Sequence, residues 1–202
     1  MKRIALIVLF SMVSTTIYAQ FDANNALYLT GEVNLGNYIG VDLNINYVYK
    51  DTYTFKIGYT DNIRDAKSKP KDFNSGLIGV LLFGVGDPDD QFENFQLCVG
   101  KLYKLNPRGT IRANMSIGLG YTIIETPENW QRIDNGAGFV GNYLWDYRKH
   151  NTISLIINPK IEFPFTRYFG LTLSPMVQIN KDTSYFGIGI GTMIGLLRSR
   201  IE

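Results

Sequence analysis

Apolar and polar residues alternate with a period of two along most of this chain. The clearest stretch is residues 39–49, where Ile, Val, Leu and Tyr take the odd positions while Asp42, Asn44 and Asn46 take even ones. Such alternation is typical of a β-strand with one apolar face. Similar patterns recur near residues 27–35, 53–60, 95–103, 111–121, 152–162, 171–180 and 186–196. The sequence therefore predicts an all-β protein with eight strands.

The polar faces of these strands carry equal numbers of acids and bases. A soluble barrel and a membrane barrel both permit alternation, but in a membrane barrel the polar face lines the interior. An unpaired buried charge would cost several kcal/mol there, so opposite charges must pair. The mid-strand charges predict such an internal network, made of Glu32, Asp42, Lys56, Arg112, Lys160 and Glu162.

Glycine and aromatic residues also favour a membrane barrel. A crowded interior needs small residues beside large ones, and the polar side of the alternation carries Gly58, Gly100, Gly118, Gly120, Gly187, Gly189, Gly191 and Gly195. Tyrosine and phenylalanine flank short turn segments at residues 50–52, 106–109 and 164–167, as aromatic belts do at membrane interfaces. We predict an eight-stranded antiparallel up-and-down transmembrane β-barrel.

The lengths of the connections predict the orientation of this barrel. Short turns are typical of the periplasmic side, so the opposite side would carry two long outer loops at about residues 61–94 and 124–151. Residues 76–86, inside the first loop, are apolar without alternation, and Asn74 or Ser75 could cap a short helix there. Two interpretations stay open: an element that dips into the outer leaflet or plugs the mouth, or a hydrophobic loop packed on its neighbour.

Residues 1–19 are predicted to be an export signal. Lys2 and Arg3 precede an apolar stretch from Ile4 to Val13, and Ala19 is a small residue before a cleavage site. That stretch is too short to span a hydrocarbon core about 30 Å thick. No later stretch reaches the roughly 18 apolar residues that a spanning helix needs. We therefore expect residues 20–202 to form the barrel.

These features resemble the small eight-stranded outer-membrane β-barrels. Residues 97–197, with their glycine-alternating last strand, are similar to an uncharacterised outer-membrane barrel family of diderm bacteria. The resemblance is architectural. It implies residence in the bacterial outer membrane and insertion by the barrel-assembly machinery, but no particular activity. The chain departs from many such barrels at residues 197–202, which lack a terminal Phe.

The amino-acid composition excludes several classes of binding partner and site. Without Lys2 and Arg3, the 20 Lys and Arg become 18, equal to the 18 Asp and Glu. A neutral chain offers no basic face for nucleic acid. A single cysteine, Cys98, and a single histidine, His150, form no metal-site pattern, and we expect no cofactor. A packed eight-stranded barrel has no open pore, so we expect a monomeric protein with a structural or surface-interaction role.

Two other functions stay open. Some barrels of the resembled group are lipid A deacylases or acyltransferases. An enzyme of that type would use His150, with Asp146 to orient it and Thr152 or Ser154 as the hydroxyl. The other is a narrow transport or small-ligand-binding barrel. Aromatic and basic residues near the outer rim are candidates for contact with outer-membrane lipid and lipopolysaccharide, namely Trp130, Trp145, Tyr147, Arg148 and Lys149.

Overall fold

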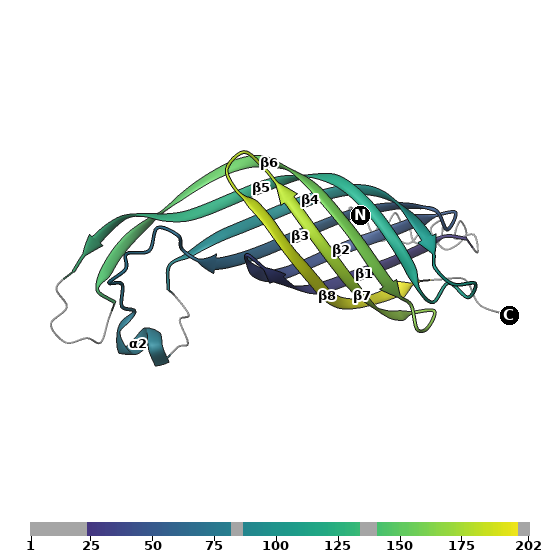
Figure 1. Cartoon of the computed structure of the whole chain (residues 1–202), viewed down its shortest axis with the longest axis horizontal. Coiled ribbons are helices and arrows are strands. Elements are labelled where there is room, and N and C mark those ends of the chain that lie inside the picture. Colours follow the sequence, from purple (N-terminus) through teal and green to yellow (C-terminus); the bar gives the residue numbers. More distant parts are fainter. Residues whose placement is uncertain (1–23, 82–86, 134–140, 198–202) are drawn as a thin grey trace, which may run out of the picture.

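The chain folds into one closed barrel. The structure is a computed structural model that describes residues 24–81, 87–133 and 141–197, so the predicted export signal lies outside the described residues. Each strand pairs antiparallel with its sequence neighbours, and β1 closes the ring against β8 (Figure 1). The predicted eight-stranded up-and-down barrel is confirmed. Its strands are β1 (Ala26–Gly36), β2 (Ile39–Tyr49), β3 (Tyr53–Asp65), β4 (Asp89–Lys104), β5 (Arg112–Arg132), β6 (Tyr143–Phe163), β7 (Phe169–Ile179) and β8 (Ser184–Leu196).

Apolar side chains face outward and polar side chains face inward. Ile45, Ile117 and Ile190, from three different strands, are 54%, 51% and 57% exposed. Glu32 and Glu162, on the opposite face, are 3% and 0% exposed. Such an exterior is favourable against lipid acyl chains and unfavourable against water. The alternation therefore has the polarity of a transmembrane barrel.

Short connections gather at one end of the barrel. The β2–β3, β4–β5 and β6–β7 connections lie together there, opposite the end that carries the long connections (Figure 1). Lys50 and Asp51 both have positive φ, 52° and 53°, as the tight hairpin turns that match strand twist require. The side chain of Lys104 reaches Asp51 across this end, with 2.7 Å between Nζ and Oδ2.

The two long connections are shorter than the sequence analysis predicts. Instead of residues 61–94, the first comprises 66–88, because β3 and β4 stay paired out to Asp65 and Asp89. Instead of residues 124–151, the second comprises only 133–142. β5 and β6 continue as a two-stranded ladder beyond the barrel rim, with a register shift between Glu128 and Gln131. Alternation fails to reveal this ladder because, past the closed ring, neither of its faces lines the lumen.

The apolar stretch of the first connection begins a short helix, α2 (Gly76–Leu81). Oδ1 of Asn74 accepts a hydrogen bond of 2.8 Å from the backbone N–H of Gly76. Asn74 therefore caps the helix, as one of the two residues considered for this role. Leu77 and Leu81 are 49% and 67% exposed, and residues 82–86 lie outside the described residues. Among described residues, no helix is both long and apolar enough to cross a membrane.

Candidate functional site

All six side chains expected in the internal charge network are buried inside the barrel. Four of them form two ion pairs: Arg112 with Glu162 and Lys160 with Glu32, each at 2.6 Å. The hydroxyl of Tyr28 also donates to Oε1 of Glu162 over 2.7 Å. Each carboxylate thus meets a charged donor and additional polar groups, which offsets the cost of burying it.

The other two charges, Lys56 and Asp42, are held by carboxamides. Nζ of Lys56 donates to Oδ1 of Asn158 over 2.6 Å. Nε2 of Gln96 donates to Oδ1 of Asp42 over 2.9 Å. These bonds span strands that are not neighbours in the ring, so the network ties the barrel wall together across its interior. The network therefore includes polar residues on the inward face of the alternation as well as the charges.

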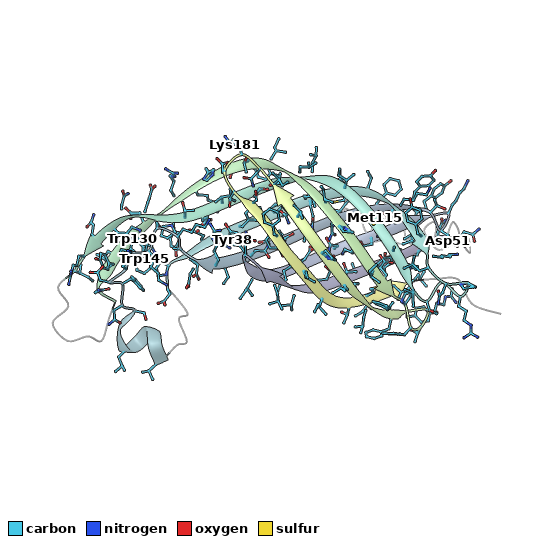
Figure 2. The ribbon with its side chains drawn as sticks, in the orientation of Figure 1. Tyr38, Asp51, Met115, Trp130, Trp145 and Lys181 are labelled. Carbon is cyan, nitrogen blue, oxygen red and sulfur yellow. The ribbon has the colours of Figure 1, made fainter. Side chains whose placement is uncertain are left out.

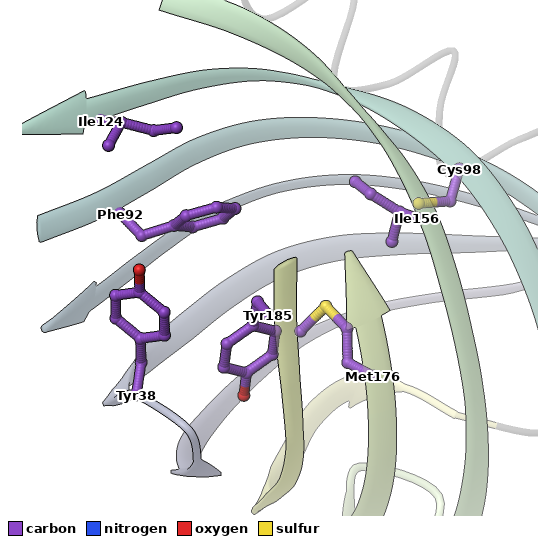
Figure 3. Close-up of a cluster of buried hydrophobic side chains, with 7 residues drawn as sticks. All are labelled: Tyr38, Phe92, Cys98, Ile124, Ile156, Met176 and Tyr185. Atoms are coloured by element: carbon purple, nitrogen blue, oxygen red, sulfur yellow. The ribbon is translucent and has the colours of Figure 1, made fainter. Parts of the chain in front are cut away.

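Two apolar clusters close the interior toward its ends. At the end that carries the long connections, which we call the outer mouth, Tyr38 packs its ring 5.7 Å from that of Phe92, and Phe92 lies 6.4 Å from Tyr185 (Figure 3). The full outer cluster is Tyr38, Phe92, Cys98, Ile124, Ile156, Met176 and Tyr185. The inner cluster is Ala26, Tyr28, Val48, Leu102, Met193 and Leu197. Sequence reasoning missed both clusters, although an apolar residue on the polar side of the alternation, as at Ile156, is a signal for such closure.

Beyond the rim, β5 and β6 form an arm with the β3–β4 connection. We use "arm" for residues 125–132, 143–149 and 66–81. Phe73 packs its ring 6.0 Å from the rings of both Trp130 and Trp145. The two tryptophan rings, labelled in Figure 2, lie 5.6 Å apart. Tyr143 completes the cluster, 6.1 Å from Trp130. The arm therefore has a small aromatic core of its own, separate from the barrel interior.

Polar contacts around Asp72 hold the connection against the hairpin. Its carboxylate accepts bonds from Arg132 at 3.2 Å and from the hydroxyl of Tyr143 at 2.8 Å. Its backbone carbonyl accepts from Nδ2 of Asn142 at 2.8 Å. The hydrogen bond to Asp72 raises the pKa of the Tyr143 phenol above its usual value. These contacts fix the connection to both strands of the hairpin.

The structure spreads the five predicted rim residues over two environments. Trp130 and Trp145 lie in the aromatic core of the arm, whereas Tyr147 is exposed. Arg148 and Lys149 lie opposite acids of the neighbouring strand: Arg148 is 3.5 Å from Glu128, and Lys149 pairs with Glu125. Because these pairs are largely exposed, each contributes little to stability, and both cations stay accessible.

The three predicted catalytic residues do not come together. Nε2 of His150 lies 3.5 Å from Oδ2 of Asp182, so the expectation that Asp146 orients it is wrong. Asp146 sits four residues along the same strand, roughly 13 Å away at about 3.3 Å per residue. Thr152 is buried on the lumen side. Nδ1 of His150 is buried without a hydrogen-bond partner in the described chain, whereas a nucleophilic relay needs a hydroxyl on the second nitrogen.

His150 instead lines a pocket of about 580 Å³ at the outer mouth. Tyr38 and Ile124, members of the outer apolar cluster, contribute to its lining. The pocket therefore adjoins the closure rather than an open channel. Its charged and titratable lining residues include Arg64, Lys67, Arg148, His150, Lys181 and Asp182. Sequence analysis identified only Arg148 and His150, because the others belong to connections and strand ends distant in the chain.

No family model matches the chain, and no curated protein matches its sequence. Solved structures do resemble its fold. A major outer membrane protein from Thermus thermophilus has a TM-score of 0.52 at 11% identity, with 85% of this chain and 99% of that chain covered. The N-terminal β-barrel domain of Pseudomonas aeruginosa OprF has a TM-score of 0.51 at 13% identity, covering 85% and 97%. The chain is thus similar in fold to outer-membrane β-barrels.

Proposed function

We propose that this protein is exported to the bacterial outer membrane and acts there as a structural or surface-interaction barrel without an open pore. The observation that carries the proposal is the contrast between a packed interior and an ordered arm. Apolar clusters and a bonded polar network fill the lumen, which disfavours passage of solutes. A projection with its own core loses little conformational freedom on binding, which favours affinity for a partner.

The outer rim would contact outer-membrane lipid and lipopolysaccharide. The guanidinium of Arg148 and the ammonium of Lys149 are suitable donors to phosphate groups, which accept charge-assisted hydrogen bonds. Exposed Tyr147 suits the same interface. Insertion would use the barrel-assembly machinery, and a closed ring without an unpaired sheet edge favours a monomer.

Surface labelling tests the location and orientation. In a Cys98→Ala background, Asn129→Cys places a thiol on the arm and Arg108→Cys places one at the end with the short turns. Intact cells are treated with a membrane-impermeant maleimide. The proposal expects labelling at position 129 and protection at position 108 until the cells are lysed. Labelling at 108 alone would reverse the orientation and remove the arm from the cell surface.

Planar-bilayer recording tests the closed interior. The purified barrel should insert without producing discrete conductance steps, because both ends of the lumen are packed. Tyr38→Ala with Tyr185→Ala, which removes two rings of the outer cluster, serves as a comparison variant. Reproducible channel steps from the unmodified protein would contradict the absence of a pore.

A further inference from the structure

The pocket at the outer mouth gathers positive charge from distant parts of the chain. Arg64 comes from β3, Arg148 from β6, Lys67 from the β3–β4 connection and Lys181 from the β7–β8 connection. Asp182 is the acid that lines it, and it faces His150 at 3.5 Å. The fold of the barrel and of its long connections brings these groups around one cavity. Figure 2 labels two of the lining residues, Tyr38 and Lys181.

The cations differ in how far their charge is compensated. Arg64 donates to Asp90, with Nη2 2.8 Å from Oδ2, and its guanidinium stacks 4.2 Å above the ring of Tyr38. These contacts fix Arg64 in the pocket. Lys67 and Lys181 take part in none of the ion pairs found among the described residues. Within that part of the chain, the pocket therefore holds two ammonium groups without an acidic partner, beside a fixed guanidinium.

We propose that this pocket binds a phosphate group, carried either by a soluble phosphate ester or by a lipid headgroup. Ammonium and guanidinium groups donate charge-assisted hydrogen bonds to phosphate oxygens. Tyr38 and Ile124 lower the local dielectric, which strengthens those bonds. A volume of about 580 Å³ admits a phosphorylated sugar. The inference rests on the proposed function only in that the mouth faces the cell exterior.

His150 makes this inference measurable, because it is the single histidine of the chain and lines the pocket. The test uses the tag-free full-length barrel in dodecyl maltoside micelles, which carry no phosphate, at low salt, titrated with inorganic phosphate and with glucose 1-phosphate. The imidazole NMR signals of His150 should shift in a saturable way. Added salt should weaken the effect, since exposed charges are screened.

Lysine variants inside and outside the pocket distinguish phosphate binding in the pocket from nonspecific electrostatic attraction of phosphate to the protein surface. Lys67→Gln with Lys181→Gln should weaken binding by about tenfold or more, the loss expected for removing charged hydrogen-bond donors. Lys71→Gln changes an exposed lysine of the same connection outside the pocket lining and should leave binding unchanged. Far-UV circular dichroism and heat-dependent gel mobility check that each variant retains the barrel.

Micelles with and without added lipid A distinguish the two sources of phosphate. If lipid A occupies the pocket, the soluble ester no longer shifts His150 in the micelles that contain lipid A, whereas an unchanged titration assigns the pocket to soluble esters. Either result supports phosphate recognition. The inference is overturned if the unmodified folded barrel shows no saturable shift with any probe, or if Lys71→Gln weakens binding as much as the double variant. Surface labelling at position 129 is independent of both outcomes.

Discussion

The barrel and the arm share two strands, β5 and β6, but these strands have different surroundings in the two regions. Within the barrel, β5 and β6 alternate between lipid and lumen, and their polar side chains are buried, as at Arg112 and Glu162. Within the arm, the ladder continues without a lumen on either side, and aromatic rings gather around Phe73 of the connection that packs on it. The backbone hydrogen bonds are alike, so the difference lies in what surrounds the strands.

This contrast explains why an ion pair in the barrel and an ion pair in the arm contribute differently to stability. The Arg112–Glu162 pair is almost fully buried, with side-chain exposures of 3% and 1%. The Arg132–Asp72 pair in the arm has exposures of 65% and 53%. Removing one partner of a buried pair leaves an uncompensated charge in the interior, whereas solvent screens the charges of the exposed pair. Loss of a charge in the barrel should therefore lower the stability of the whole barrel, whereas loss of a charge in the arm should affect only the arm.

The largest effect is expected from Glu162→Leu. The variant leaves Arg112 buried without its carboxylate and should lower the free energy of unfolding by about 3–5 kcal/mol. Urea unfolding in lipid vesicles measures this change. Arg112→Met combined with Glu162→Leu should recover part of the loss, because no uncompensated charge is left while the buried hydroxyl of Tyr28 still lacks its acceptor. A double variant no more stable than the single one would contradict the role of the stranded charge.

The next effect is expected from Gly118→Val. A Cβ atom at this glycine would lie 2.6 Å from Cα of Cys98 and 2.5 Å from its sulfur. Because backbone is among the atoms met, β4 and β5 must shift apart, which should lower the free energy of unfolding by about 2 kcal/mol. Met115→Val, on the outward face of the same strand, is the control and should change it little. Equal stabilities of the two variants would argue against a tightly packed wall at Gly118.

A smaller and local effect is expected in the arm from Phe73→Ala. The variant removes ring contacts with Trp130, Tyr143 and Trp145, which should lower the local stability of the arm by about 1–2 kcal/mol. Both tryptophans of the chain lie in the arm, so tryptophan emission should shift to longer wavelength while barrel unfolding stays unchanged. Tyr147→Ala, at an exposed arm position, is the control. A fall in barrel stability would show that arm and barrel unfold together.

The smallest effect is a pH dependence confined to the arm. The hydrogen bond from Tyr143 to Asp72 raises the pKa of the folded phenol. Its contribution is therefore fully present below the unfolded value of about 10 and is lost as pH rises through the folded pKa. Tryptophan emission should shift in that alkaline range, and Tyr143→Phe should abolish this step. A step that persists in Tyr143→Phe would assign it to another group.

Local pattern was sufficient to predict the fold. Alternation with a period of two needs only neighbouring residues, so the strand count and the inward polarity of Glu32 or Lys56 follow directly from it. The same pattern failed at residues 124–132, where β5 extends past the closed barrel and alternation stops although the strand continues. Loop length was overestimated because alternation reports the environment of a strand rather than its hydrogen bonding.

The sequence by itself determined which side chains face inward and that their charges balance. Only the tertiary structure decided which of them meet: Lys160 pairs with Glu32 across 128 residues, and His150 faces Asp182 rather than Asp146. Closure of the ring likewise assembled the cationic mouth pocket from five separate stretches of the chain, around residues 38, 64–67, 124–126, 148–150 and 181–183. The physical reason is that alternation acts along one strand, whereas pairing in the lumen depends on the register and position of strands around the ring.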